Sequence, residues 1–137
     1  MNILIDTNFI LDFLTEREPF FVNSDKIIQM CKTDELTGYI AAHSILNSFY
    51  ILRKVYSVKE RRDMLFRFIK ITSVVGVGEN KITKALLRED FKDFEDCLQD
   101  ECAVSCGAEY IITRNVEDFV ESKVKAITPD DFLRLME

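Results

Sequence analysis

The amino-acid sequence predicts an α/β protein built around a parallel sheet. Short apolar or β-branched runs alternate with helical patterns along the chain, which is typical of parallel strands joined by helices. The chain has 137 residues, of which 47% are hydrophobic, enough to bury the core of one ordinary domain at residues 1–137. Only four glycines and two prolines occur, too few for a disordered or linker-rich chain.

The first half of the chain alternates strand and helix signals. Its strand signals are short apolar runs, and its helix signals are apolar residues three or four positions apart. After Ala42, for example, Ile45, Phe49, Leu52 and Tyr56 recur at helical spacing. In chain order we expect a strand at Asn2–Ile5, helices at Asn8–Leu14 and Val22–Thr33, a strand at Thr37–Ile40, a helix from Ala42 and a helix at Lys59–Lys70.

The second half continues the alternation. β-branched residues mark its strands, and an apolar residue at every fourth position gives its longest helix one buried stripe. In chain order we expect a strand at Ile71–Val75, a helix at Glu79–Leu87, a helix carrying Phe94, Leu98, Cys102 and Cys106, strands at Tyr110–Thr113 and Lys125–Thr128, and a terminal helix opened by Pro129.

The cysteines and the amino terminus indicate a cytoplasmic protein. The four cysteines lack both the density of a disulfide scaffold and the paired spacing of a zinc site. We expect them to be reduced and packed as small hydrophobes. Asp6 interrupts the first apolar run before a signal-peptide core can form, and no run of about 18 apolar residues occurs. Neither secretion nor membrane contact is expected.

Charge is unevenly distributed along the chain. The formal net charge of −6 argues against a protein that coats nucleic acid through a basic surface. The segment Arg53–Lys70 is nevertheless basic, and it either contacts phosphates or forms the solvated side of two helices. The segment Glu89–Glu101 is densely acidic, and it is either a solvated helix face or a divalent-cation site.

Several polar residues are expected at one edge of the sheet. Asp6 follows the first strand, and Asn115 and Asp118 follow the strand Tyr110–Thr113, so all three fall beyond carboxyl ends, where open parallel sheets bind ligands. Asp93, Asp96 and Asp100 share one helix face, from which at least Asp96 can reach the same cleft. Capping of helices is the alternative role for Asp6 and Asp93.

Three segments in this order resemble the PIN-domain family. They are Ile5-Asp6-Thr7-Asn8, Asp93-Phe94-Glu95-Asp96-Cys97-Leu98-Gln99, and Ile111-Ile112-Thr113-Arg114-Asn115-Val116-Glu117-Asp118-Phe119. The resemblance covers essentially the whole chain. It implies a three-layer α/β/α sandwich around a parallel sheet. Active members of the family are metal-dependent ribonucleases, and many are the toxin halves of VapBC toxin–antitoxin modules.

The resemblance implies an incomplete acidic site. Asp6 matches the first metal-binding acid and Asp96 the third, while Asn47 stands where the family has its second acid. Asn115 matches the fourth position, and Asp118 can supply a carboxylate instead. The expected cofactor is Mg²⁺ or Mn²⁺, held by Asp6, Asp96 and Asp118, with Asn47 and Asn115 completing the site. An asparagine offers an oxygen but no charge, so cation affinity should be weaker.

One helical stripe bears on this site. His43, Asn47, Tyr50 and Lys54 form a polar stripe opposite Ile45 and Phe49, and this stripe either faces the cleft or is ordinary helix surface. His43 either orients water or a phosphate, or is a hydrogen-bonded structural histidine.

The resemblance also implies partners, and it leaves rival functions open. An RNA substrate, an antitoxin protein and a homodimer are expected, with Phe20, Phe21 and Val22 a candidate apolar surface. One rival is a degenerate PIN domain that binds RNA or a protein without cleavage. Another is a small phosphatase or a receiver-like domain, which fits less well because Asp6-Thr7-Asn8 is not a D-x-D pair and the later strands lack a receiver's phosphoacceptor and lysine.

Overall fold

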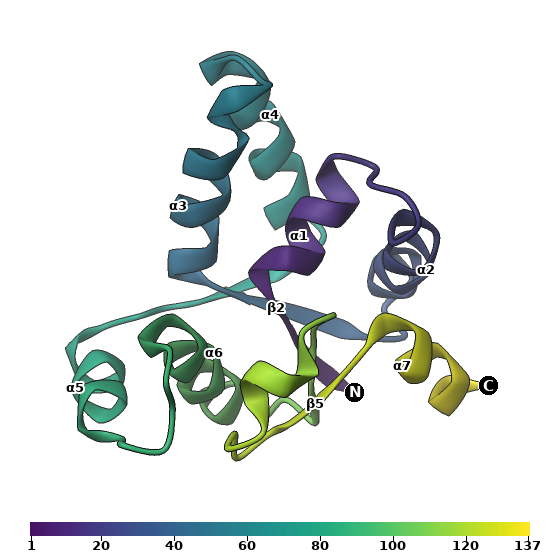
Figure 1. The fold of residues 1–137 in the computed structure, drawn as a ribbon. Helices are drawn as coiled ribbons and strands as arrows, with labels where there is room; N and C mark the ends of the chain where they lie inside the picture. Colours follow the sequence, from purple (N-terminus) through teal and green to yellow (C-terminus); the bar gives the residue numbers. More distant parts are fainter.

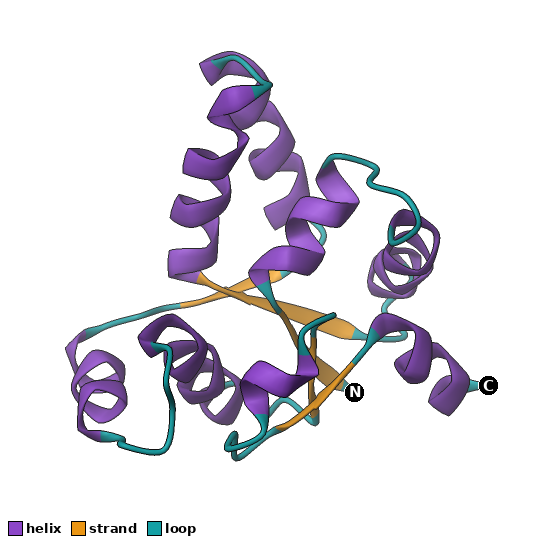
Figure 2. Cartoon of the chain, viewed as in Figure 1, coloured by secondary structure: helices purple, strands orange, loops and turns teal.

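The computed structural model describes all residues, 1–137, as five strands and seven α-helices (Figure 1, Figure 2). The strands are β1 (Asn2–Ile5), β2 (Thr37–Ala41), β3 (Ser73–Val75), β4 (Tyr110–Ile112) and β5 (Lys125–Ile127). The helices are α1 (Thr7–Leu14), α2 (Phe21–Lys32), α3 (Ala42–Ile51), α4 (Val58–Ile69), α5 (Glu79–Leu87), α6 (Phe94–Ser105) and α7 (Pro129–Met136). Two short 3-10 helices are η1 (Leu52–Lys54) and η2 (Val116–Phe119). The predicted alternation is confirmed.

All strands are parallel, in the order β3-β2-β1-β4-β5. Strand β1 is central, and it pairs Leu4 with Tyr39 of β2 on one side and with Ile111 of β4 on the other. The first half of the chain therefore adds β2 and β3 on one side of β1, and the second half adds β4 and β5 on the other. The point where the order reverses lies between β1 and β4, where parallel α/β proteins place their sites.

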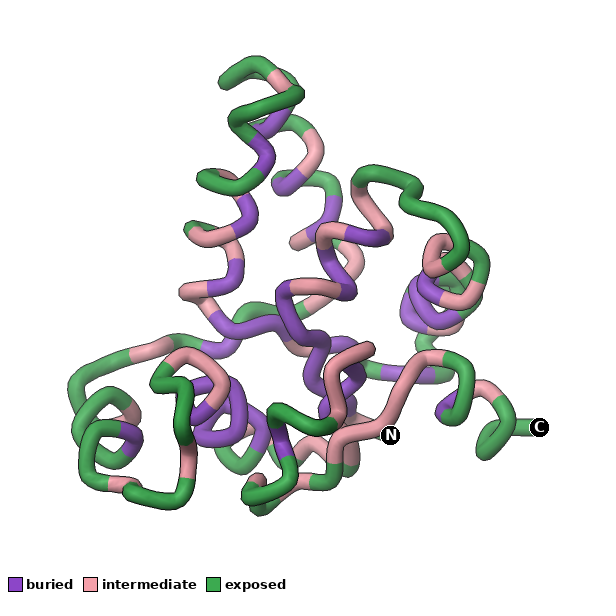
Figure 3. Tube along the Cα trace, viewed as in Figure 1, coloured by how far each residue is buried: buried purple, intermediate pink, exposed green.

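Alternate residues of β1 bury themselves in two separate cores. Ile3 and Ile5 pack in a core that includes Phe9 of α1 and Phe132 of α7. Leu4 points to the other face and packs in a core that includes Cys102 of α6. Figure 3 shows the buried residues concentrated in the strands and on the inner sides of the helices. The result is the expected three-layer α/β/α sandwich.

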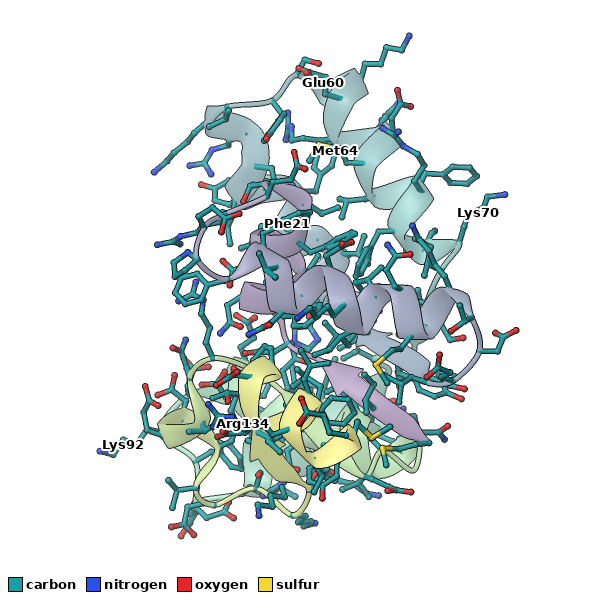
Figure 4. All side chains as sticks on the ribbon, turned by 90° about the vertical axis from the view of Figure 1, so that its right-hand side faces the viewer. Phe21, Glu60, Met64, Lys70, Lys92 and Arg134 are labelled. Atoms are coloured by element: carbon teal, nitrogen blue, oxygen red, sulfur yellow. The ribbon has the colours of Figure 1, made fainter.

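Helices α3 and α4 rise from the carboxyl edge of the sheet as a pair (Figure 1). Figure 4 shows Glu60 near one end of α4 and Lys70 at the other. Arg61 is buried between the two helices, where its Nη1 donates to the carbonyl of Phe49 at 2.8 Å and its guanidinium lies 4.2 Å from the Phe49 ring centroid. Arg61 thus joins the helices and is not available to RNA. The other basic residues of Arg53–Lys70 are exposed.

Two predicted helix faces are corrected. The fully buried side chains of α3 are Ser44 and Ser48, while Ile45 and Phe49 are only half-buried. On α6, Cys97 is buried and Phe94 is exposed, because Asp93 caps the helix and leaves Phe94 in its first turn at the surface. Ser44 is buried because it contacts Thr7 of α1 and Gln99 of α6, which a pattern of large apolar residues does not reveal.

The four cysteines are free thiols, with Cys31, Cys97 and Cys102 buried as predicted for small hydrophobes. The expected apolar surface near the second helix is partly covered. Phe21 stacks on Phe13, and the guanidinium of Arg114 lies 4.4 Å from the Phe20 ring centroid. Of this group only Val22 is exposed. No helix has both the length and the apolar character needed to cross a membrane.

Candidate functional site

Asp6 lies at the carboxyl end of the central strand and is almost fully buried. Its Oδ1 accepts from the Thr7 backbone N–H at 2.8 Å, so Asp6 caps α1, which is the alternative role that the sequence offered for it. Its Oδ2 accepts from the Thr113 hydroxyl at 2.8 Å, because β4 pairs with β1 and ends beside it. Two donors from two segments therefore fix this carboxylate.

Asp96 and Glu95 lie in the first turn of α6. Asp93 caps the helix by accepting from the Asp96 backbone N–H at 3.0 Å, so the capping role given as the alternative for Asp93 is confirmed. The first turn of α6 lies near the end of β1, since Glu95 Oε1 is 3.5 Å from Oγ1 of Thr7, the residue after Asp6. Asp6 lies close enough to Asp96 that its negative charge raises the pKa of Asp96.

The electrostatics of the two aspartates are unusual. Burial raises the pKa of Asp6 to about 6, with further increases from Glu95 and Asp118, against the lowering effect of the hydrogen bonds from Thr113 and Thr7. Burial raises the pKa of Asp96 to about 7, and the negative charges of Asp93, Asp6, Asp118 and Glu95 add to the increase. Both shifts mean that the charged forms are disfavoured unless positive charge is brought in.

Asp118 and Asn115 follow β4 in the turn that contains η2. Asp118 is exposed and near enough to raise the pKa of both Asp6 and Asp96. Asn115 donates its backbone N–H to Thr113 Oγ1 at 3.1 Å and accepts from the Asp118 backbone N–H at 3.0 Å. Asp96, Asp118 and Asp93 line a hollow of about 520 Å³ between α6 and η2.

Asn47 lies one turn farther from the sheet than His43 and Ser44 on α3. It is half-buried and forms no side-chain hydrogen bond to the acidic residues. Of the predicted polar stripe, Tyr50 and Lys54 are exposed, whereas His43 lies near enough to Glu95 to be affected by its charge. Burial lowers the pKa of His43 while Glu95 acts in the opposite direction, and neither ring nitrogen has a hydrogen-bond partner.

Asp100 is not part of this cluster. Its side chain is fully buried, and it accepts from Arg88 Nη1 at 2.7 Å and from the backbone N–H groups of Lys123 and Val124. The same Arg88 nitrogen lies 2.8 Å from Glu101 Oε2. The acidic stretch Glu89–Glu101 therefore divides into a group facing the sheet edge and a group neutralised by Arg88.

Three site residues are absent from the sequence-based set. The sequence does not distinguish Glu95 from Asp96, which directly follows it, because the direction of each side chain depends on how the helix begins. Ser44 and Gln99 are buried below the cluster, where Gln99 Nε2 donates to Ser44 Oγ at 2.7 Å. The only sequence signal for these residues was polar side chains at positions that a helical pattern assigns to the interior.

The donor chemistry of the cluster suits a hard cation. Asp6, Glu95, Asp96 and Asp118 offer only oxygen atoms, and none of them forms an ion pair with lysine or arginine. Their side chains do not converge on one position, since no group of three or more acidic, cysteine or histidine residues is arranged to hold a metal ion. The residues thus fit a divalent cation by charge and atom type, and binding one requires side-chain movement.

These features define a parallel α/β protein with an acidic site where its strand order reverses. The family model described as PIN domain matches residues 2–117, and the chain belongs to the PIN-domain family. No curated protein matches the sequence.

Solved structures share the fold at low sequence identity. VapBC2 from Rickettsia felis, bound to a promoter DNA fragment, has a TM-score of 0.69 at 15% identity, covering 93% of this chain and 98% of that one. A toxin–antitoxin complex from Klebsiella pneumoniae has a TM-score of 0.69 at 18% identity, covering 92% and 96%. VapC20 from Mycobacterium tuberculosis, described as a toxin that cleaves the sarcin-ricin loop, has a TM-score of 0.64 at 14% identity, covering 80% and 86%.

Proposed function

We propose that this chain is a divalent-metal-dependent endoribonuclease that hydrolyses RNA phosphodiester bonds. The observation that carries the proposal is the cluster of Asp6, Glu95, Asp96 and Asp118, four carboxylates from three segments with no ion-pair partner. Such crowding is unfavourable in the protein alone and is relieved by a cation. Membership of the PIN-domain family and the likeness to VapC20 support the same activity.

In this proposal Asp6, Asp96 and Asp118 hold Mg²⁺ or Mn²⁺, and Asn47 and Asn115 add neutral oxygens around them. The cation, when bound, lowers the pKa of a water molecule and offsets charge on the phosphate. Thr7 and Thr113 keep the Asp6 carboxylate in one orientation through the hydrogen bonds described above. Glu95 supplies the negative charge that Asn47 lacks.

The test is cleavage of a labelled single-stranded RNA with Mg²⁺, with Mn²⁺ and with excess chelator. Asp96→Asn should abolish cleavage that the unaltered protein shows with metal, because it removes a charge at the centre of the cluster. Glu89→Gln is the matched control, since Glu89 is an exposed acid of the same stretch with no bonded partner. Cleavage that persists with chelator, or equally in Asp96→Asn, contradicts the proposal.

We further propose that the protein is the toxin of a cytoplasmic toxin–antitoxin pair and forms a homodimer. The likeness to VapBC complexes supports an antitoxin partner. An apolar groove of about 710 Å³ between α3 and α4 supports the dimer, with Leu46 69% and Phe66 57% exposed. Arg62 and Asp63 stand at the same groove, so a two-fold pairing can match each charge with its opposite.

A second candidate function is RNA or protein binding without cleavage, and Asn47 is the residue that favours it. An asparagine at a position where the family has an acid lowers the charge available to a cation. Association with RNA that is unchanged by chelator, together with no cleavage of any RNA by the unaltered protein, would support this function instead.

A further inference from the structure

A buried polar triad lies directly below the acidic cluster. It joins Thr7 of α1, Ser44 of α3 and Gln99 of α6, segments far apart in the sequence. Gln99 Nε2 donates to Ser44 Oγ at 2.7 Å and to Thr7 Oγ1 at 3.3 Å, and the two hydroxyl oxygens are 2.9 Å apart. Ser44 and Gln99 are fully buried, so water cannot substitute for these bonds.

The two hydroxyl hydrogens of the triad have one arrangement in which each of them meets an acceptor. The Gln99 amide nitrogen donates to both hydroxyl oxygens, so each hydroxyl already accepts a hydrogen bond from Gln99. The Ser44 hydroxyl then has one acceptor within reach, Thr7 Oγ1. The reverse direction leaves the buried Ser44 hydrogen without an acceptor, which is costly.

This arrangement leaves the Thr7 hydroxyl hydrogen free to point elsewhere. Its other acceptor is Glu95 Oε1, at 3.5 Å. That distance is long for a hydrogen bond to a carboxylate, so the contact orients Glu95 without neutralising it. Thr7 therefore serves two acids, because its backbone N–H holds Asp6 and its hydroxyl faces Glu95.

We propose that Gln99 and Ser44 are positioning residues that turn the Thr7 hydroxyl toward Glu95 and keep this carboxylate beside Asp6 and Asp96. The inference rests on the proposed function, since a cation is what the positioned acids receive. Hydrogen bonds that orient the groups around a metal ion commonly change metal affinity about 10- to 100-fold. The triad thus tunes a site whose second family acid is an asparagine.

The chain provides a matched control on the same helix. Ser48 lies one turn after Ser44 on α3 and is also fully buried, but its hydroxyl has no hydrogen-bond partner. Ser44→Ala and Ser48→Ala make the same chemical change at the same depth. Only Ser44→Ala breaks the chain of hydrogen bonds that ends at Glu95.

The experiment is calorimetric titration of Mn²⁺ into the metal-free full-length protein at pH 8, with urea unfolding of each variant as a folding check. We expect Ser44→Ala to weaken Mn²⁺ binding about tenfold or more, and Ser48→Ala to stay within about twofold of the unaltered protein. Thr7→Ser keeps the hydroxyl and should keep the affinity, whereas Thr7→Val should lose it. If Ser44→Ala does not fold, the comparison of Mn²⁺ affinity between Thr7→Val and Thr7→Ser tests the positioning role.

The possible failures are distinguishable. Equal Mn²⁺ affinity in Ser44→Ala and Ser48→Ala, or in Thr7→Val and Thr7→Ser, overturns the positioning role and leaves the proposed function intact. An unaltered protein that binds no Mn²⁺ overturns the metal-dependent function, and the positioning role with it.

Discussion

Arg114 forms an ion pair with Asp12 in which Nε lies 2.6 Å from Oδ2, tying the turn after β4 to the side of α1. The Asp12 side chain is 3% exposed, and the Arg114 guanidinium also covers the Phe20 ring. This pair sits one residue after Thr113, whose hydroxyl holds Asp6. Two neighbouring residues after β4, Thr113 and Arg114, therefore bind the segment that follows β1.

Replacing Arg114 should be costly because it leaves a buried carboxylate without a partner. We expect Arg114→Ala to lower the free energy of unfolding by about 3 kcal/mol. Arg134→Ala is the matched control, since Arg134 pairs with Asp130 and Asp131 at the surface, and it should cost less than about 1 kcal/mol. Urea unfolding measures both, and equal costs would contradict the structural role.

Stability should fall as pH rises through the range in which Asp6 and Asp96 lose their protons. Their folded pKa values of about 6 and about 7 lie above the ordinary 3.8, so the folded state binds more protons than the unfolded state between about pH 4 and pH 7. The free energy of unfolding then decreases with pH across that window. Denaturant melts in chelator should show this decrease, and Asp96→Asn should flatten it.

Adding Mn²⁺ should remove the same decrease, because a cation binds the deprotonated acids and only in the folded state. RNA cleavage should decline below about pH 6 to 7, because Asp6 and Asp96 are then protonated and bind the cation less well. If the free energy of unfolding depends on pH in the same way with Mn²⁺ and with chelator, the acidic cluster does not bind the cation.

Asp100 should affect stability and not chemistry. Asp100→Asn places an amide against Arg88 and two backbone N–H groups, and we expect a loss of about 3 to 5 kcal/mol in the free energy of unfolding. At a temperature where the variant stays folded, its cleavage rate should match that of the unaltered protein. A selective loss of activity in folded Asp100→Asn would place Asp100 in the site after all.

Restoring an acid at position 47 should strengthen cation binding. Asn47→Glu adds a carboxylate at the position where the family has its second acid, and we expect Mn²⁺ affinity to rise severalfold. Asn115→Asp tests the fourth position in the same titration. An affinity that is unchanged in Asn47→Glu would contradict the assignment of position 47 to the cation site.

The homodimer predicts that disruption of the α3–α4 groove yields monomers. Leu46→Asp should shift the protein from dimer to monomer at micromolar concentration in sedimentation velocity, because it puts a charge in the apolar contact. Leu87→Asp is the control, as Leu87 is a similarly exposed apolar residue on α5. A monomeric unaltered protein, or a dimer insensitive to Leu46→Asp, counts against this interface.

The sequence predicts the order of elements well because each signal is local. The helix at Glu79–Leu87 and the strand at Asn2–Ile5 have the expected bounds, and β3 is shorter than the β-branched run that predicts it. Asp6 and Asp118 could be assigned to one edge because the ends of parallel strands meet there. Whether a residue follows a strand can be read from its neighbours in the sequence, and in a parallel sheet this also places it near residues that follow other strands.

The rest of the site depends on partners that the sequence does not pair. Asp96 and Asp100 are one helical turn apart and look alike in the sequence, yet only Asp100 meets Arg88, whose position depends on the loop before α6. Ser44 looks like an interruption of an apolar pattern, and its role emerges only when Gln99 packs against it. Tertiary contacts decide these assignments.

The contact between Asp6 and Thr113 also sets a condition on synthesis. The two residues lie 107 positions apart, and the strands that bring them together are β1 and β4. A nascent chain that has not yet extended past β4 lacks the donor that holds Asp6 and lacks Asp118 altogether. The acidic cluster therefore assembles only when most of the polypeptide has left the ribosome, and translation products that end before Asp118 cannot contain the whole cluster.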